Sequence, residues 1–398
     1  MIYMDVTSAS ASPINMGVQR TVRGLHRLLA SGMGAAVTPV RWDFFRRNYA
    51  LLSKRERDFL ENPFASYQSG QAVPGRWQWK SWLASCWDSA TRGARLIDLS
   101  SVMGKNDVLF IPDLCWDLRI YSWKRLASWP GRKVAVFHDA MPLNIPGQAE
   151  SNDTVFRHYV AALGRLDQVI CISKEVRDDL LRYWAEMGVE AKPTPLLVWP
   201  VPFSGPRPDN RPNQTARHLI YVARLKLRKN HLVLLEACES LWSRGIEFSL
   251  DLIGVEDSVT DTWRICQRVD ELAAKGRPVR WRKHISDEEL NQAYQAASFT
   301  VFPSRMEGFG LPILESLWHG RPVICGRNGA IGEVASDGGG CLQIDQNDPS
   351  QLAAAMEKLL SDPDFYQSLC AEAGRRHFRT WEEYGRDLGP VLGLQPAG

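Results

Sequence analysis

The sequence lacks any run of about 20 uncharged apolar residues, the length that a helix needs to cross a bilayer, so we do not expect an integral membrane protein. Its first residues, Met1 to Val6, have no basic segment followed by an apolar core. No signal peptide is predicted, and we expect the chain to stay in the cytoplasm. The eight cysteines are scattered without a Cys-x-x-Cys pair, which predicts small buried residues and no metal site.

A strong charge excess is also missing. The 398 residues carry a formal net charge of +3, which is too small to indicate a nucleic-acid partner. No short repeat of fixed period is present, so a solenoid is not expected. The hydrophobic fraction of 44% and the length together predict two globular domains of roughly 150 to 200 residues each.

Short β-branched runs alternate with longer helical patterns throughout the chain, which is typical of parallel sheets covered by helices. The predicted fold class is therefore α/β, with two Rossmann-like halves in tandem. A proline-rich segment from Pro193 to Pro212 disfavours both helix and central strand and is interpreted as the linker. The predicted strands are Ile2–Val6, Val108–Ile111, Val134–Phe137, Val169–Ile172, His218–Ala223, Phe248–Ile253, Val279–Lys283, Phe299–Phe302, Pro322–Cys325 and Cys341–Ile344.

Two helices are predicted in the second half, at 230–244 and 287–297. In the first of them Leu232, Leu235, Ala237 and Leu241 are expected to share an apolar stripe. In such folds ligands bind at the carboxyl ends of the strands, so the loops that follow strands carry the candidate site.

The segment from Arg305 to Glu315 follows an apolar strand and opens a helix. Gly308 and Gly310 let the backbone approach a ligand, and Pro312 suits a first helical turn. Free amides and the helix dipole at that start favour a diphosphate, which assigns donor binding to Gly308, Phe309, Gly310 and Leu311. Carboxylates accept hydrogen bonds from paired hydroxyls, so we expect Glu315 to hold a ribose and Glu307 a sugar.

This string resembles the E-x7-E signature of retaining glycosyltransferase family 4, whose members have the GT-B fold of two Rossmann-like domains facing across a cleft. The run from Ala223 to His231 is similar to the family's strand-end element, in which an Arg and a Lys hold the donor diphosphate. The resemblance implies that role for Arg224 and Lys229. Many members have Gly where this chain has Ala223. Lys226 and Arg228 are expected to face solvent.

The N-terminal half carries further similar elements. Phe137 to Pro142 resembles the family's HD-x-x-P element, which implies that His138 orients the donor and the acceptor hydroxyl. Gly17 opens a loop similar to G-[IV]-x-R, where it leaves room for the donor, and Arg20 is interpreted either as acceptor-facing or as a surface residue. Asp139 is expected to serve a turn, and Ser173 to cap a helix.

The resemblance implies a domain organisation of 1–200 for the acceptor, 201–378 for the nucleotide sugar, and a helix at 379–398 that crosses back to the first domain. It also implies a same-face substitution in which His138, Glu307, Arg224 and Lys229 act on the reacting groups. The two cations would replace a divalent ion, so we expect no metal and no cofactor. The first strand is not followed by GxGxxG, which disfavours a dinucleotide-dependent oxidoreductase.

The motifs do not identify the sugar. Arg228–His231 is similar to bacterial mannosyl and related rhamnosyl transferases of polysaccharide and lipopolysaccharide biosynthesis, so GDP-mannose is the first expectation, with rhamnose and hexosamine donors left open. The acceptor is expected to be a glycan or a lipid-linked glycan. A nucleotide-sugar epimerase of GT-B shape and a non-catalytic nucleotide-sugar-binding protein are the alternative functions.

A basic stretch and a tryptophan cluster lie in a region, residues 41–105, that matches no motif. The stretch is interpreted either as a solvated helix or as a contact surface for the acceptor or for the inner face of the membrane. Its cations are Arg41, Arg46, Arg47, Lys54, Arg55 and Arg57, and the cluster comprises Trp77, Trp79, Trp82 and Trp87.

Overall fold

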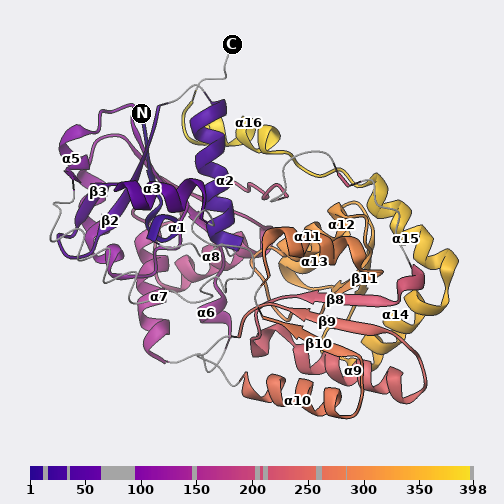
Figure 1. Ribbon diagram of the computed structural model, residues 1–398. Coiled ribbons are helices and arrows are strands. Elements are labelled where there is room, and N and C mark those ends of the chain that lie inside the picture. The colour runs from indigo at the N-terminus through magenta and orange to yellow at the C-terminus, as the bar shows by residue number, and fades with distance from the viewer. Residues whose placement is uncertain are drawn as a thin grey trace. The chain divides into compact units, whose positions relative to one another are not determined.

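The computed structural model (Figure 1) describes residues 1–11, 17–33, 36–63, 95–145, 150–201, 207–208, 214–256, 262–283 and 285–394. The chain divides into two compact units, one formed by Met1–Pro202 with Arg379–Gly398 and the other by Phe203–Phe378. Each unit is built on a largely parallel sheet covered by helices, as expected for a Rossmann-like domain. The predicted α/β fold class is confirmed.

The first unit is built on a seven-stranded sheet in the order β4-β3-β2-β1-β5-β6-β7. The strands β1, β2, β5, β6 and β7 are parallel, whereas β3 runs antiparallel between β2 and β4. The strands are β1 Ile2–Asp5, β2 Val37–Asp43, β3 Asn48–Leu51, β4 Leu96–Ile97, β5 Val108–Ile111, β6 Arg132–Phe137 and β7 Gln168–Cys171. The helices are α1 Thr7–Ala11, α2 Gly17–Gly32, α3 Lys54–Glu61, α5 Leu99–Val102, the 3-10 helix η1 Leu118–Ser128, α6 Met141–Asn144, α7 Glu150–Leu163, α8 Lys174–Glu186 and α16 Trp381–Val391.

The C-terminal helix α16 returns to the first unit and packs on α2 (Figure 1). Gly24 makes that approach possible, because a Cβ there would lie 2.4 Å from the ring of Trp381. Ser173 caps α8 by accepting a hydrogen bond from the Val176 amide, and Asp139 accepts one from the Met141 amide, which confirms the predicted cap and turn.

The second unit is built on a six-stranded, wholly parallel sheet in the order β10-β9-β8-β11-β12-β13. Its strands are β8 His218–Val222, β9 Ser249–Ile253, β10 Val279–Arg282, β11 Phe299–Phe302, β12 Val323–Gly326 and β13 Cys341–Ile344. Its helices are η2 Gln214–Ala216, η3 Leu227–Lys229, α9 His231–Ser243, α10 Trp263–Ala274, α11 Asp287–Ala296, α12 Leu311–Trp318, α13 Gly329–Ser336, α14 Pro349–Ser361 and α15 Pro363–Arg375. The predicted strands all coincide with observed strands to within one or two residues at each end.

Two predictions about local structure were wrong. Leu232 is 37% exposed, whereas Leu235, Ala237 and Leu241 are buried as predicted; the buried stripe of α9 also includes His231, Leu234, Cys238 and Trp242. In the basic stretch, which was interpreted as a solvated helix, only Lys54, Arg55 and Arg57 lie in a helix, α3. Arg41 lies in β2 and is buried, with its Nε 2.7 Å from the Glu56 carboxylate. The tryptophans at 77, 79, 82 and 87 lie outside the described residues.

Candidate functional site

The sheet of the second unit has a switch point between β8 and β11, where the strand order reverses. Ligands of open parallel sheets bind outside the carboxyl ends of the strands at such a point. The loop after β8 carries Arg224 and Lys229, and the loop after β11 carries Glu307 to Gly310. Both predicted donor loops therefore meet at the position where the topology places a ligand.

The side chains of these two loops form one ionic cluster. The Lys229 ammonium group donates a hydrogen bond to Glu307 Oε1, and Ser304 Oγ donates to the same oxygen. Arg228 Nη1 lies 3.2 Å from that carboxylate oxygen. The Lys229 and Glu307 side chains are each 11% exposed, so the pair is largely withdrawn from water.

The electrostatics of the cluster fix its charge state. Burial alone would raise the pKa of Glu307, but Lys229 and Arg228 outweigh it and lower that pKa to about 2. Burial lowers the pKa of Lys229 to about 8, and Glu307 opposes that shift. Near neutral pH the carboxylate is ionised and the lysine is mostly protonated, which leaves a cation available to an anionic ligand.

Arg228 does not face solvent, contrary to the sequence prediction. Its Nη1 donates to the Met306 carbonyl at 2.8 Å, and its own carbonyl accepts from the Arg305 amide at 2.9 Å. Arg228 therefore joins the loop after β8 to the loop after β11. The sequence prediction failed because the partners of Arg228, the Met306 carbonyl and the Glu307 carboxylate, lie almost 80 positions further along the chain.

The start of α12 has the predicted form. Gly310 adopts a φ of +112°, in the left-handed region that side chains disfavour, and Pro312 lies in the first turn. No side chain caps this helix start in the described structure. Phe309 is buried beneath it. The amides at Gly310 and Leu311 and the positive end of the helix dipole thus suit a phosphate group.

Glu315 lies one turn into α12 and is 3% exposed. Tyr294 of α11 donates its hydroxyl hydrogen to Glu315 Oε2 at 2.8 Å. This contact positions the carboxylate. Sequence reasoning missed Tyr294, since the pattern of α11 marks it only as a core residue.

Gly254, at the end of β9, is a second residue that the sequence did not single out. Its φ is +146°, and a Cβ there would lie 2.2 Å from the Ala223 carbonyl and 3.2 Å from the Arg224 amide. The backbone after β9 therefore lies close to the backbone at the end of β8. Arg224 is half-buried at the end of β8.

The first unit has its own switch point, between β1 and β5. Asp5 ends β1 and accepts hydrogen bonds from Arg119 at 3.1 Å and from the Tyr49 hydroxyl at 3.0 Å. Asp113, after β5, accepts from the Ser8 amide and hydroxyl, and burial raises its pKa above the usual range. This buried network was not predicted from the sequence, although Asp5 directly ends the first strand.

His138 lies at the carboxyl end of β6 and is 4% exposed. Its Nε2 and the Pro112 carbonyl are 2.8 Å apart, so this nitrogen carries the hydrogen. Its ring stacks on Trp199, which stacks in turn on Tyr384 of α16. Burial lowers the pKa of His138 to about 4, so the imidazole is neutral near pH 7. The orienting role predicted for it remains a prediction.

Gly17 and Arg20 occupy the first turn of α2, with Gly17 exposed and Arg20 half-buried. The helix predicted to follow this loop is present, but it begins at Gly17, so Gly17 and Arg20 lie in the helix and not in a loop before it. Residues 12–16 of the preceding loop lie outside the described residues, and the donor and acceptor roles of Gly17 and Arg20 stay predictions.

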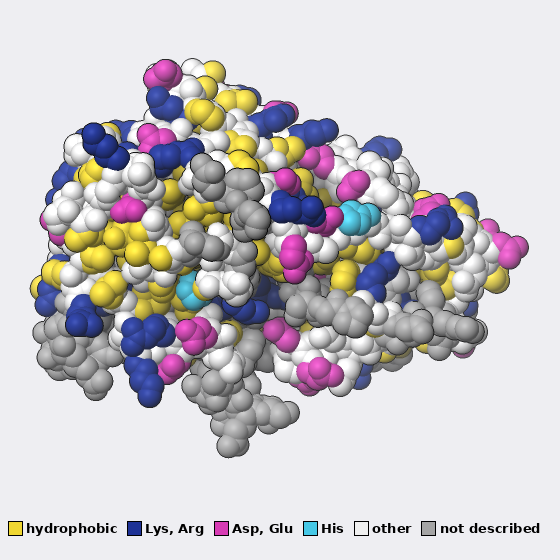
Figure 2. Space-filling view, turned by 90° about the horizontal axis from the view of Figure 1, so that it is seen from above, with side chains coloured by type: hydrophobic (Ala, Val, Ile, Leu, Met, Phe, Trp, Pro, Cys, Tyr) yellow, Lys and Arg dark blue, Asp and Glu magenta, His cyan; other side chains and the backbone are white. Residues whose placement is uncertain are grey.

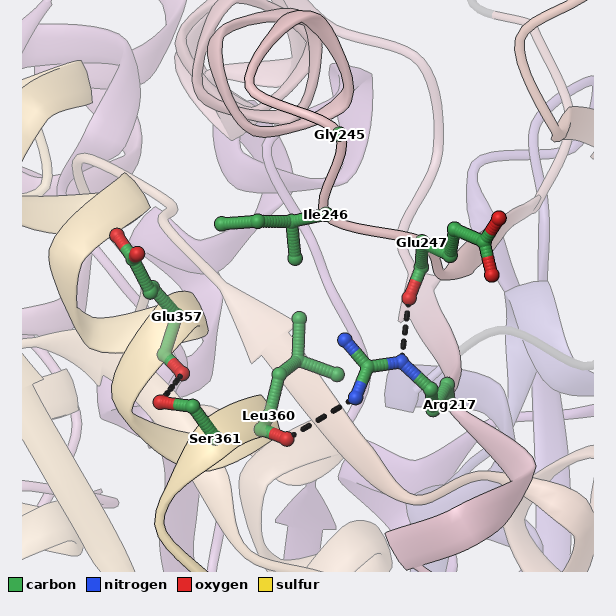
Figure 3. Close-up of a pocket in the computed structure, with 7 residues that line it drawn as sticks. All are labelled: Arg217, Gly245, Ile246, Glu247, Glu357, Leu360 and Ser361. Atoms are coloured by element: carbon green, nitrogen blue, oxygen red, sulfur yellow. Dashed lines mark hydrogen bonds between the residues drawn. The ribbon is translucent and has the colours of Figure 1, made fainter.

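A pocket of about 460 Å³ elsewhere on the second unit is not part of this site (Figure 3). It lies at the amino ends of β8 and β9. Arg217 points between the carbonyls of Glu247 and Leu360 and donates to both, so its charge serves the loop structure. Among the described residues, no group of three or more His, Cys, Asp or Glu side chains has a metal-binding arrangement. No helix in the described part of the chain is both long and apolar enough to span a bilayer.

Comparison with known families finds a match for the second unit. Residues 206–377 match the family model described as glycosyl transferases group 1. The second unit is similar to group 1 glycosyltransferases. The match contains Arg224, Lys229 and the whole Glu307–Glu315 segment, and it confirms the resemblance of those motifs to glycosyltransferases.

Several curated relatives share this domain. The chain is 29% identical to the serotype-specific mannosyltransferase WbdA of Escherichia coli over 284 residues, which is 65% of this chain and 34% of that protein. It is 32% identical to the Escherichia coli O-antigen chain mannosyltransferase B over 171 residues, 42% of each chain. The aligned part thus spans about a third to two fifths of these relatives.

Solved structures extend the fold comparison to the whole chain. Sucrose-phosphate synthase from Thermosynechococcus elongatus has a TM-score of 0.66 at 20% identity and covers 98% of this chain and 97% of that one. Anabaena HepE in complex with UDP has a TM-score of 0.64 at 14% identity, with 98% of both chains covered. These neighbours have the GT-B fold, as the sequence predicts.

Proposed function

We propose that this protein is a retaining hexosyltransferase that moves a sugar from a nucleotide sugar to a glycan or lipid-linked acceptor in bacterial cell-surface polysaccharide biosynthesis. The observation that carries the proposal is the ionic cluster of Lys229, Arg228 and Glu307 at the β8/β11 switch point, beside the uncapped start of α12. It combines cations for a diphosphate with a carboxylate for sugar hydroxyls.

In the proposed reaction, Arg224 and Lys229 bind the diphosphate, and Glu307 accepts hydrogen bonds from hydroxyls of the transferred sugar. As the bond to the diphosphate breaks, negative charge grows on its oxygens and is stabilised by these cations and by the α12 amides. The acceptor hydroxyl attacks from the face that the diphosphate leaves, and its proton passes to a leaving phosphate oxygen. We propose that the cations serve in place of a divalent ion.

Mannose from GDP-mannose is the proposed donor. The support comes from the two Escherichia coli relatives, both named as mannosyltransferases. His138, Gly17 and Arg20 are proposed to serve the donor and acceptor from the first unit.

A transfer assay with product analysis tests this function. The full chain is incubated with GDP-mannose and an α-mannoside acceptor, and the anomeric configuration of the new linkage is read by proton NMR. An α-linked product supports retention, and a β-linked product contradicts it. An epimerase would consume the donor without any acceptor, and a non-catalytic binder would leave both substrates unchanged.

Contact with an anionic membrane surface is a further part of the proposal. The β2–β3 hairpin ends in a turn where Phe45 is 80% exposed and is followed by the exposed Arg46 and Arg47. Figure 2 shows exposed hydrophobic side chains beside lysine and arginine side chains on one face of this unit. An aromatic residue flanked by cations suits a lipid headgroup region, where acceptors carried on a lipid are found.

A further inference from the structure

The first unit contains a second cavity, of about 220 Å³, between η1, the β2–β3 hairpin and the end of β4. Its lining includes three tryptophans, Trp42, Trp123 and Trp129, and the polar residues Asp98, Ser122 and Arg125.

The register of the strands places this cavity at the ligand-binding edge of the sheet. Trp42 near the end of β2 and Ile97 at the end of β4 both pair with Tyr49 of β3. Asp98 directly follows Ile97. The cavity therefore lies at the carboxyl ends of β2 and β4, the edge that also carries the β1/β5 switch point.

Tyr49 links the cavity to that switch point. Its ring contacts Trp42 edge-on with centroids 5.1 Å apart, and Trp129 at 6.4 Å, while its hydroxyl donates to Asp5. Trp42 and Trp129 thus both pack on Tyr49, whose hydroxyl is held by Asp5 at the end of β1. A rigid aromatic wall is a good surface for a ligand with an apolar face.

The polar groups are arranged for hydroxyls. Hydrogen bonds from the Ser100 side chain and amide hold the pKa of Asp98 below its usual range, so its carboxylate is an ionised acceptor. Arg125 lies beside it and donates to the Arg47 carbonyl at 3.4 Å. Trp123 is 1% exposed, and its indole N–H has no hydrogen-bond partner within the described structure. A buried donor in the wall of a cavity is satisfied when a ligand hydroxyl accepts from it.

We propose that this cavity is a subsite for one neutral hexose residue of the acceptor glycan. Sugar rings present C–H groups on a face and hydroxyls around the edge, which matches tryptophan walls with Asp98 and Arg125 among the polar lining residues. The carboxylate of Asp98 disfavours a phosphate as the occupant. The inference rests on the proposed function, because it assigns part of the acceptor to the first unit.

The test measures glycoside binding to the full chain without any nucleotide, by saturation-transfer NMR and calorimetry. The probes are the methyl α-glycosides of mannose, glucose, galactose, N-acetylglucosamine and rhamnose, with inorganic phosphate as a separate probe. Asp98→Asn keeps the cap of α5, and Arg125→Ala removes a donor that lines the cavity. Each is expected to weaken binding about tenfold. Lys124→Ala removes an exposed cation of η1 that does not line the cavity, and binding is expected to stay within about twofold.

Binding of a glycoside that depends on Asp98 and Arg125 but not on Lys124 supports the subsite. Absence of glycoside binding overturns it, as does equal binding in all variants or binding of phosphate alone. Ser122→Trp, which fills the cavity, gives a second variant with the same expected loss. Nucleotide binding by the Lys229 site is measured separately, so failure of the subsite leaves the proposed transfer reaction standing, and failure of nucleotide binding identifies an error in that reaction.

Discussion

Lys229 donates a hydrogen bond to Glu307 across 78 residues of sequence, so the cation assigned to the diphosphate and the carboxylate assigned to the sugar contact each other directly. A nucleotide sugar joins a diphosphate to a hexose through one bond. A donor that binds across this pair would place its diphosphate at Lys229 and its hexose at Glu307.

Replacement of Lys229 by alanine is expected to weaken binding of a nucleoside diphosphate. Loss of a hydrogen bond to a charged group costs about 1.5–3 kcal/mol, which corresponds to roughly 10- to 150-fold in the dissociation constant. Calorimetry on the purified variant measures this loss. Lys275→Ala, which removes an exposed lysine paired with Glu239, is the control and should bind as the wild type does. Equal affinity in Lys229→Ala and wild type would remove Lys229 from the donor site.

The pH dependence of donor binding follows from the same lysine. Burial lowers the pKa of Lys229 to about 8, so the group is protonated below that pH and loses its charge above it. The second ionisation of a phosphate has a pKa of about 6, so the charge of the nucleotide does not change in that pH range. The affinity for a nucleoside diphosphate should therefore fall as the pH rises through about 8, as measured by calorimetry. In Lys229→Arg the charge persists, and a decline as steep as in the wild type would contradict this assignment.

Tyr294 is expected to position Glu315 for the ribose. Tyr294→Phe removes the 2.8 Å hydrogen bond while keeping the ring stacked on His319, so nucleotide affinity should fall by about 0.5–1.5 kcal/mol. The matched control is Tyr366→Phe, which removes a hydrogen bond to the Ser298 carbonyl in the same unit. Both variants should lose similar thermal stability, and only Tyr294→Phe should lose affinity. Similar nucleotide affinity in the two variants would assign Tyr294 a structural role alone.

The hairpin tip is expected to bind anionic vesicles. A cation near an anionic surface contributes about 1 kcal/mol, so the double change Arg46→Ala and Arg47→Ala should reduce the partition coefficient roughly 30-fold. Sedimentation with phosphatidylglycerol vesicles measures it, with phosphatidylcholine vesicles as the lipid control. Arg165→Ala, exposed in the loop before β7, should bind normally. Unchanged sedimentation of the double variant would exclude the tip as the contact. Trp79, which belongs to the tryptophan cluster near these cations in the sequence, lies outside the described residues.

The sequence predicted most of the strand framework because central parallel strands are short continuous apolar runs, as in Val108–Ile111 and Phe299–Phe302. It failed in residues 37–51, where the strands carry buried charge. Arg41 pairs with Glu56 of α3, and neither partner can be recognised as buried from its own neighbours. In sequence, a strand with such an ion pair resembles a solvated helix.

The sequence predicted the motifs of the candidate donor site but not the residues that hold those motifs in place. Glycines and carboxylates at fixed spacing identify Gly310, Glu307 and Glu315, since the chemistry of a diphosphate and of hydroxyls demands those residue types. Tyr294 and Gly254 come from other strands and helices. Their contribution depends on which segments the fold brings together, and that information is absent from a local pattern.

The most direct test of the central claim is a thermal-shift and calorimetry panel with GDP, UDP, dTDP and ADP sugars, with NAD and NADP as controls. Selective stabilisation by one nucleotide-sugar class, lost in Lys229→Ala, is the predicted result. A response to the dinucleotides alone would contradict the assignment of this chain as a nucleotide-sugar-dependent transferase.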